Sequence, residues 1–434
     1  MTTLHSLLSI YLHIPFCVHR CAYCDFNTYA GQEDSIPAYV DALLREINYI
    51  GSRLSDYQTT ELSNYKTAHT IFFGGGTPSL LSGPQLASVM DALHAAFAFT
   101  PDLEASLEAN PGTTSPEFLY SIREAGLNRL SFGVQSANPD ELRMLERAHD
   151  FFDVIQSVKW ARQAGFNNLN LDLIYGLPEQ TLDRWQNTVK RIVDLHPEHI
   201  SAYALTLEHG TPFGRWSAQG LLPTPNPDLV ADMYEWASEF FESAGYVQYE
   251  ISNWARDVQP LTPVLSVVEG FNLQPAFACR HNLQYWRGLP YLGLGAGAHG
   301  YADGIRYSNV LRIKTYIDRL TDSQFINLPF PLTPATVNQH HQTQHDDVSE
   351  FMMTGLRLTL EGISPLEFES RFGARLDDGY GKDIEDLIRL GLLERYQLPS
   401  PFGSPTGVIR KGRGDEVLRL TVFCQRSRVC SGRP

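Results

Sequence analysis

LLSIYLHIPFCVHRCAYC, residues 7–24, joins an apolar stretch to three cysteines. The run 7–14 is short, apolar and rich in residues typical of a buried strand, and Cys17, Cys21 and Cys24 follow it directly. A structural zinc site usually has four protein ligands and a disulfide has two. Three clustered cysteines therefore predict a metal site in which one coordination position has no protein ligand.

The stretches beyond this segment repeat one pattern. Apolar, β-rich runs at 69–75, 103–110, 128–134, 168–176, 199–207 and 246–252 alternate with amphipathic stretches such as 36–50, 83–97, 150–165 and 182–195. A strand followed by a helix, many times over, predicts βα units and a parallel sheet. No glycine-rich dinucleotide fingerprint follows the first run. We therefore expect an α/β fold, a full or partial (β/α) barrel, with its site at the C-terminal ends of the strands.

Polar or glycine-rich clusters follow the predicted strands. They are the three cysteines, GGGTP (74–78), Glu108 with Asn110, GVQS (133–136), Asp172 with YGLP (175–178), and Tyr203 with Thr206. Each cluster alone is also compatible with ordinary turn chemistry. Their shared position after strands favours one common site, because the C-terminal ends of parallel strands meet at one mouth.

Composition narrows the class of protein. The chain has 434 residues and a net charge of −15, which argues against a binder of nucleic-acid phosphates. We find no apolar run long enough for a transmembrane segment and no signal peptide. Six cysteines are too few for a disulfide scaffold in so long a chain. A reducing, cytoplasmic location is the expectation.

The C-x3-C-x2-C spacing suits an iron–sulfur cluster. Three thiolates can each bind one iron of a [4Fe–4S] cluster and leave the fourth iron for a small molecule. The alternative is zinc, with His19 or Cys279 as the fourth ligand.

The cysteine motif CVHRCAYC resembles the loop of radical S-adenosylmethionine (SAM) enzymes. YLHIPFC (11–17), FFGGGTPSLL (72–81), SFGVQS (131–136) and DLIYGLPEQT (172–181) are similar to one branch, that of oxygen-independent coproporphyrinogen III oxidases and HemW-type haem chaperones. The resemblance runs from Tyr11 to Trp254, resumes at Cys279 and continues to about Thr421. It implies a radical SAM barrel in which an electron from the cluster cleaves SAM to a 5′-deoxyadenosyl radical.

Site residues follow from the resemblance. It places the cluster on Cys17, Cys21 and Cys24. It assigns the SAM pocket to Tyr11, Tyr23, Gly75, Gly76, Thr77, Glu108, Gln135, Arg147 and Asp172. Glycine lets backbone groups approach a ligand closely, and Glu108 suits a pair of ribose hydroxyls. For Arg147 the alternative is a solvated helix residue, whereas Asp172 lies in an apolar run and needs buried partners.

Three features distinguish the branches of this family. The oxidases extend the motif to C-x3-C-x2-C-x-C and carry a longer N-terminal segment, whereas this chain has Phe26 at the last position and a short N-terminal stretch. HNLQYW (281–286) matches the H-N-x-x-Y-W motif associated with haem in the chaperone branch. His281 could bind haem iron, with Asn282, Tyr285 and Trp286 beside the ring. The alternative is that His281 and Asn282 cap a turn while the two aromatics belong to the core.

The resemblance therefore implies a haem chaperone that binds a [4Fe–4S] cluster, SAM and haem, and delivers haem to an acceptor protein. It would also need an electron donor. The alternative function is that of an oxygen-independent coproporphyrinogen III oxidase in porphyrin biosynthesis.

We expect five regions along the chain. They are a radical SAM barrel (1–256), an atypical insert (257–278), a haem-motif and connecting region (279–335), a C-terminal domain (336–423) and an atypical tail (424–434). Amphipathic stretches at 348–358, 364–373 and 377–395, then strands at 407–412 and 416–423, predict a winged-helix-like module. We interpret this module as a cover over the barrel mouth. The 22 residues of the insert, immediately before Cys279, could displace His281.

Overall fold

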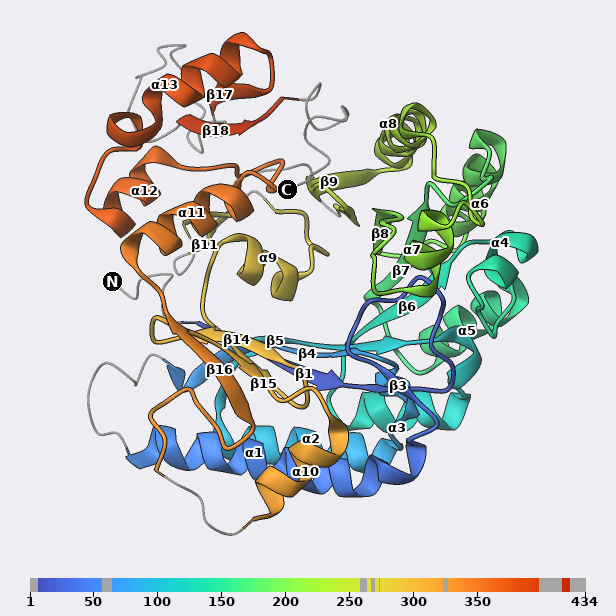
Figure 1. Cartoon of the computed structure of the whole chain (residues 1–434), viewed down its shortest axis with the longest axis vertical. Coiled ribbons are helices and arrows are strands. Elements are labelled where there is room, and N and C mark those ends of the chain that lie inside the picture. The colour runs from blue at the N-terminus through green and yellow to red at the C-terminus, as the bar shows by residue number, and fades with distance from the viewer. Residues whose placement is uncertain are drawn as a thin grey trace.

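A large, open sheet organises the molecule (Figure 1). The computed structural model describes residues 7–56, 65–257, 264–266, 270–272, 274–322, 327–397 and 416–421. Its main sheet has 12 strands in the order β16-β15-β14-β13-β1-β4-β5-β6-β7-β8-β10-β9. The two edge strands, β16 and β9, do not pair with each other, so the barrel is partial.

Parallel strands form the centre of this sheet. They are β1 (Leu8–Ile14), β4 (Thr67–Gly75), β5 (Ala98–Ala109), β6 (Arg129–Gln135), β7 (Leu169–Tyr175) and β8 (His199–Ala204). On the other side of β1, β13 (Tyr291–Leu294) is also parallel to it. The α/β prediction and the six parallel strands with their crossovers are therefore confirmed.

Antiparallel strands extend both edges. One edge holds β14 (His299–Ala302), β15 (Ile305–Asn309) and β16 (Thr336–His341), and the other holds β9 (Tyr246–Glu250) and β10 (Asn253–Arg256). The seventh predicted strand is β9, and it does not continue the parallel array. Only residues 251–252 separate β9 from β10, and so short a connection permits only antiparallel pairing.

Helices cover one face of the sheet. They are α1 (Ile36–Asp56), α2 (Gly83–Ala96), α3 (Pro116–Glu124), α5 (Phe151–Gln163), α6 (Leu182–Val193), α8 (Pro227–Ser243) and α10 (Ile313–Thr321). The short helices α4 (Pro139–Met144) and α7 (Pro212–Ala218) contribute Met144 and Phe213 to a separate apolar cluster with Ala22, which lies between Cys21 and Cys24. Side-chain caps fix where several of them begin. Ser82 and Gln85 form a capping box on α2, and Asp150 and Asp153 form one on α5.

The alternation of side chains in the strands determines the core. Ile10 and Leu12 of β1 are fully buried and belong to the same apolar cluster as Leu43 and Ile47 of α1. Each following parallel strand contributes to this cluster through alternate residues. The other set of alternate residues is largely polar and faces away from the helices.

The C-terminal part forms a smaller unit with its own core. It contains α11 (Gln344–Gly355), α12 (Pro365–Phe372), α13 (Leu376–Arg389), β17 (Leu393–Gln397) and β18 (Glu416–Leu420). The three helices agree with the predicted winged-helix-like module. The helix predicted over 377–395 is too long, because Gly391 adopts a left-handed φ of +72° and ends it, and β17 follows. β17 pairs with β18, while the strand predicted at 407–412 lies outside the described residues.

Short elements complete the description. β2 (Phe16–Cys17) pairs with β3 (Tyr29–Ala30), and the one-turn helix η2 (Glu33–Ser35) follows β3. Two further one-turn helices, η4 (Pro78–Leu80) and η5 (Pro111–Thr113), follow β4 and β5 of the main sheet. In the atypical insert, β11 (Val264–Ser266) pairs with β12 (Gly270–Asn272). Helix α9 (Arg280–Trp286) lies between the sheet and helices α11 and α12 (Figure 1). None of the described helices combines the length and the apolar character that crossing a membrane requires.

A buried carboxylate joins α1 to the β13–β16 edge. Glu46 is fully buried and accepts hydrogen bonds from the Gly295 amide at 2.8 Å, Tyr316 at 2.6 Å, Thr333 at 2.7 Å and Asn309 at 2.9 Å. Burial raises the pKa of Glu46, and these hydrogen bonds oppose that shift.

We predict that Glu46→Ala lowers the free energy of unfolding by about 3 kcal/mol, because several buried donors lose their acceptor. Urea denaturation followed by circular dichroism measures the change. Glu242→Ala, at an exposed position of α8, serves as the control and should change stability by less than about 0.5 kcal/mol. Equal effects of the two substitutions would contradict a special role of the buried carboxylate.

Candidate functional site

Polar side chains line the face of the parallel strands that turns away from the helices. Residues that are paired on neighbouring strands show this. Ser9 of β1 lies beside Thr70 of β4, and Glu108 of β5 lies beside Ser131 of β6. Asp172 lies beside Ser201 in the same way. Since burying polar groups without partners is costly, a polar inner face on successive strands indicates a site.

The cysteine loop leaves the sheet at the end of β1 and is anchored by backbone contacts. The Tyr29 amide donates to the Pro15 carbonyl at 2.8 Å, and the Cys24 amide donates to the Cys21 carbonyl at 3.1 Å. Asn27, just after the loop, donates to the Ala296 and Leu311 carbonyls, each at 3.1 Å. The loop is therefore fixed at its exit as well as at its entry.

The glycine-rich segment after β4 binds to the start of this loop. The Gly76 amide donates to the Ile14 carbonyl at 2.8 Å, and the Thr77 amide donates to the Phe16 carbonyl at 2.7 Å. The Thr77 hydroxyl lies 3.6 Å from Cys17 Sγ. GGGTP thus reaches the first cysteine directly.

Glycine is required here by close approach. A Cβ at Gly76 would lie 2.5 Å from the Phe16 carbonyl oxygen, and one at Gly75 would lie 2.5 Å from the His13 ring. Gly75 also has a φ of +109°, which side chains other than hydrogen disfavour. The resemblance assigns these glycines to the SAM pocket, and in the structure their close contacts are to the chain just before Cys17.

Arg147 is bound to the second cysteine and is not a solvated helix residue. Its Nη1 lies 3.6 Å from Cys21 Sγ, and its Nη2 donates to the Gly133 carbonyl at 2.6 Å and to Asn110. Asn110 in turn donates to the Thr77 hydroxyl at 3.0 Å. Three strand ends, those of β4, β5 and β6, therefore meet at the cysteine loop. The Arg147 Nε is buried and has no acceptor among the described residues.

Burial shifts the titration of several groups at this end of the sheet. It raises the pKa of the Cys17 thiol, although the Thr77 hydroxyl opposes the shift, and it also raises the pKa of the Cys24 thiol. Tyr23 packs beside Phe213 with ring centroids 6.4 Å apart, and burial raises its pKa too. Each shift favours the neutral form of the group.

Two carboxyl groups lie deeper on the inner face. Burial, with a further contribution from the charge of Asp172, raises the pKa of Glu108 to about 8. Glu108 accepts a hydrogen bond from the Gly75 amide at 3.0 Å. Asp172 accepts from Ser131 at 2.7 Å and from Asn170 at 2.8 Å, which supplies the buried partners that its position demanded. The Tyr11 hydroxyl, on the same face, is hydrogen-bonded to His13 Nδ1 at 3.0 Å.

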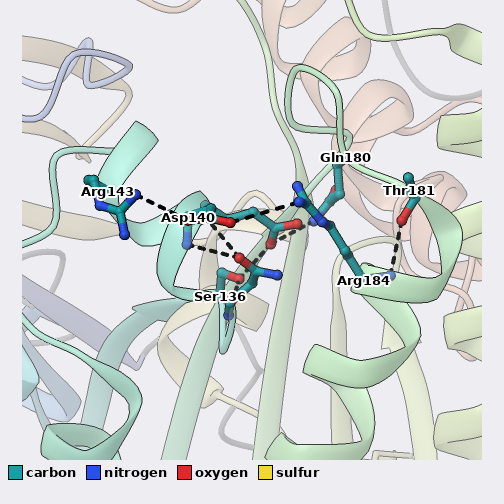
Figure 2. A network of polar contacts seen from close by, with 8 residues as sticks. Ser136, Asp140, Arg143, Gln180, Thr181 and Arg184 are labelled. Atoms are coloured by element: carbon teal, nitrogen blue, oxygen red, sulfur yellow. Dashed lines mark hydrogen bonds and ion pairs between the residues drawn. The ribbon is translucent and has the colours of Figure 1, made fainter.

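The strand ends of β6 and β7 are held together by a separate polar network (Figure 2). The Ser136 hydroxyl donates to the buried Glu141 carboxylate at 2.6 Å, and Gln180 donates to the same carboxylate oxygen at 3.2 Å. Gln135, immediately before Ser136, has a φ of +69°. Few residues other than glycine adopt such a conformation, and those that do tend to cluster at functional sites.

The zinc alternative finds no support in this arrangement. His19 is bound to Glu146 at 2.9 Å, and Cys279 Sγ lies 3.7 Å from Glu104, which precedes Glu108 by four residues in β5. Within the described ranges, no three His, Cys, Asp or Glu side chains converge on a point suited to one metal ion. A [4Fe–4S] cluster makes a different demand, because each thiolate binds its own iron.

The HNLQYW helix, α9, lies against the polar inner face. His281 is buried, with its Nδ1 2.7 Å from the Thr70 hydroxyl and its Nε2 2.9 Å from the Tyr285 hydroxyl. Burial lowers the pKa of His281 to about 3, so its imidazole is neutral. Its ring stacks on Phe72 at 5.1 Å, and Phe72 stacks on Tyr11 at 6.3 Å. The haem motif and the predicted SAM pocket thus share one aromatic wall.

The C-terminal unit contacts the other end of α9. The Arg357 guanidinium lies 4.3 Å from the centre of the Trp286 ring, and Arg287 pairs with Glu361 at 2.5 Å. The Trp286 Nε1 is buried without an acceptor among the described residues. Asn282 is only partly buried. The alternative, in which His281 merely caps a turn, does not describe this residue. Its ring is buried and its Nδ1 is hydrogen-bonded to Thr70 of β4.

Comparison with known proteins agrees with this geometry. Residues 11–192 match the Radical SAM superfamily, and residues 342–396 match the HemN C-terminal domain. The heme chaperone HemW of Bacillus subtilis is 38% identical over 390 residues, covering 90% of this chain and 93% of the relative. HemW of Escherichia coli is 37% identical over 398 residues, with 89% and 91% covered. The solved structure of coproporphyrinogen III oxidase (HemN) from E. coli covers 97% of this chain and 88% of its own, with a TM-score of 0.73 and 24% identity.

The partial barrel and the cysteine loop, together with these matches, define a radical SAM protein. Within that superfamily, the chain belongs to the family of the haem chaperone HemW. Membership in the superfamily implies a [4Fe–4S] cluster and SAM as cofactors. The likeness to HemN, at its level of identity, concerns the fold alone.

Gly76→Ala tests the close approach of GGGTP to the cysteine loop. Its Cβ would collide with the carbonyls of Ile14 and Phe16, so we expect the loop to move and the iron bound after anaerobic reconstitution to fall severalfold. Gly112→Ala is the matched control, since a Cβ there meets only His149 at an ordinary 3.8 Å. Iron and sulfide analysis per chain measures both variants, and full iron content in Gly76→Ala would show that the loop tolerates the displacement.

Proposed function

We propose that this protein is a haem chaperone that holds a [4Fe–4S] cluster, SAM and haem, and delivers the haem to an acceptor protein. The proposal also includes an electron donor for the cluster. The observation that carries it is the convergence of Thr77 and Arg147 on the sulfurs of Cys17 and Cys21, with the HNLQYW helix on the same inner face. The HemW relatives carry the same activity in their names.

The cysteine loop fits the cluster. Cys17, Cys21 and Cys24 are only half-buried, and the hydroxyl of Thr77 and the guanidinium of Arg147 are oriented to donate to two of the sulfurs. Such donors favour thiolates, which are the form that binds iron. The buried Arg147 Nε, which has no acceptor within the described part of the chain, offers one more donor at the site. When bound, the cluster supplies one-electron chemistry to SAM.

The SAM pocket would lie between the strand ends. Gly75, Gly76 and Thr77 bring backbone close to the cysteine loop, and Glu108 lies behind them. In this proposal Glu108 accepts from the ribose hydroxyls, and Tyr11 closes the pocket on the haem side. Tyr23, Gln135, Arg147 and Asp172 complete the proposed lining.

Haem would bind at the HNLQYW helix. A neutral imidazole is the form that coordinates iron, and His281 is held in that form. Its Nε2 is hydrogen-bonded to Tyr285, so this hydroxyl has to turn away when His281 coordinates iron. Asn282, Tyr285 and Trp286 would then lie beside the ring. The buried Trp286 Nε1–H, for which the described residues provide no acceptor, is available as a donor.

Substitution of each cysteine tests the cluster assignment. We expect Cys17→Ala, Cys21→Ala or Cys24→Ala to abolish the absorbance near 400 nm and the EPR signal of the reduced cluster, whereas Cys279→Ala, remote from the loop, retains both. Anaerobic reconstitution with iron and sulfide followed by EPR makes the measurement. Stoichiometric zinc without iron in the wild-type protein would contradict the proposal.

The pKa of Glu108 predicts how SAM affinity depends on pH. Below its pKa of about 8 the carboxyl group is protonated, and accepting two ribose hydroxyls requires the carboxylate. Binding therefore releases a proton, and affinity should rise by up to about tenfold per pH unit until pH 8 and then level off. Equilibrium dialysis from pH 6 to 9 measures it. Glu108→Gln should weaken binding and remove this pH dependence, and an unchanged profile in that variant would refute the role of Glu108.

Haem titration tests His281. We expect a Soret shift in the wild-type protein that His281→Ala weakens or alters, because the variant loses the imidazole ligand. His340→Ala is the control, since that imidazole is exposed and pairs with Asp346 at 3.2 Å. An identical spectrum and affinity in His281→Ala would exclude it as the ligand.

Incubation with coproporphyrinogen III, SAM and reductant separates the chaperone from an oxidase. We expect no release of carbon dioxide and no protoporphyrinogen IX by mass spectrometry. Release of two carbon dioxide molecules per substrate would overturn the chaperone proposal.

A further inference from the structure

The HNLQYW helix lacks a cap of its own. The first amide groups of a helix have no intrahelical acceptor, and a side chain at the N-cap position usually supplies one. Cys279 occupies that position in α9, and its side chain forms no capping hydrogen bond. The His281 and Asn282 amides lie near its sulfur and partly oppose the rise of its pKa on burial, but a thiol is only a weak acceptor. Because Cys279 and His281 are buried, solvent cannot replace the missing acceptor.

Glu104 of β5 supplies the cap from across the fold. Its Oε2 accepts from the Arg280 amide at 3.2 Å, and its Oε1 accepts from the His281 amide at 3.2 Å. The same Oε1 lies 3.7 Å from Cys279 Sγ. Glu104 is itself buried, on the inner face of the sheet. A carboxylate at a helix N-terminus is favoured by the helix dipole as well as by these hydrogen bonds.

A buried cation balances this carboxylate. Burial would lower the pKa of Arg129, but the neighbouring Cys279, Glu104 and Tyr249 groups raise it, so the guanidinium keeps its charge. Arg129 is almost fully buried. A buried carboxylate without a nearby positive charge would be costly, and the attraction to Arg129 offsets part of that cost.

Other contacts of the first turn do not replace Glu104. The Arg280 side chain pairs with Asp102 at 2.6 Å, but Asp102 is 73% exposed and holds only the guanidinium. The Thr70 hydroxyl fixes His281 Nδ1 at 2.7 Å, which orients the ring once the backbone is in place. Glu104 is therefore the group that sets where the backbone of His281 lies.

We propose that Glu104 is a positioning residue for the haem motif: by capping α9 from strand β5, it places the His281 imidazole where iron can reach it. This inference rests on the proposed function, in which His281 is the haem ligand. The contact between Glu104 and α9 also links the haem motif to the proposed SAM pocket, because Glu104 and Glu108 lie on the same face of β5.

The test compares three variants by two measurements. Glu104→Ala removes the cap, Glu104→Gln keeps one acceptor, and Asp102→Asn is the matched control that removes only the ion pair with the Arg280 side chain. The first measurement is haem titration followed in the Soret band. The second needs no haem: alkylation of Cys279 by iodoacetamide, resolved by peptide mass spectrometry, reports opening of the first turn, because this thiol is fully buried.

We expect Glu104→Ala to bind haem about tenfold more weakly, with a Soret band that approaches that of His281→Ala, and to be alkylated at Cys279 faster than wild type. Glu104→Gln should be intermediate in both measurements, and Asp102→Asn should match wild type. Cluster content and circular dichroism of each variant establish that it is folded.

Unchanged alkylation of Cys279 in Glu104→Ala would overturn the inference. Faster alkylation with an unchanged Soret band and affinity would overturn it as well, because the cap would then not position His281. If the wild-type Soret band proves insensitive to His281→Ala, the haem assignment of the proposed function fails, and the alkylation measurement alone decides whether Glu104 holds α9.

Discussion

The alternation of side chains along the parallel strands is the constraint on which the structure depends. In each strand one set of residues, such as Ile10 and Leu12 in β1, packs on the helices. The intervening set, including Tyr11, faces the other way, because successive residues of a strand point to opposite faces. A shift of one residue in any strand would bury the polar set among the helices and place the apolar set in the site.

This polar inner face is stable only because its groups satisfy one another. Glu104 accepts the amides of α9, Arg129 lies close to that carboxylate, and Asp172 accepts from Ser131 and Asn170. The same residues that hold the structure together therefore also shape the site. The same polar network supports both the stability of the fold and the geometry of the site. Substitutions on the inner face should therefore rarely change ligand binding without also changing stability.

Much of this could be read from the sequence, and the remainder depends on distant pairings. Local signals sufficed for the six parallel strands, the cysteine loop and the segment GGGTP, since periodicity and spacing are properties of neighbouring residues. Arg147 was identified by resemblance, but its contact with Cys21 depends on where three strands end. Glu104 was missed, because nothing in LEASLEAN shows that residues 280 and 281 would lie beside it. The strand at 246–252 was predicted, but its antiparallel pairing was not, because that pairing follows from the tight turn after β9. β17 was taken as the end of a helix, because the pattern over 377–395 does not show that Gly391 adopts a left-handed conformation.

The insert of 22 residues before Cys279 begins and ends at firmly held points. Arg256 closes β10, with its amide donating to the Glu198 carbonyl at 2.8 Å, and Ala255 and Cys279 share one apolar cluster with Tyr249. A connection whose two ends are already fixed close together can be lengthened at little entropic cost, since that cost grows only slowly with length. The described end of the insert takes part in this packing, because Phe277 and Ala278 lie in the same cluster as Leu283 of the His281 helix. The part of the insert that is nearest to the helix is therefore held in place. For protein engineering, this junction is a natural acceptor position, where a fluorescent label, an affinity tag or a whole guest domain could be introduced while the haem motif keeps its place.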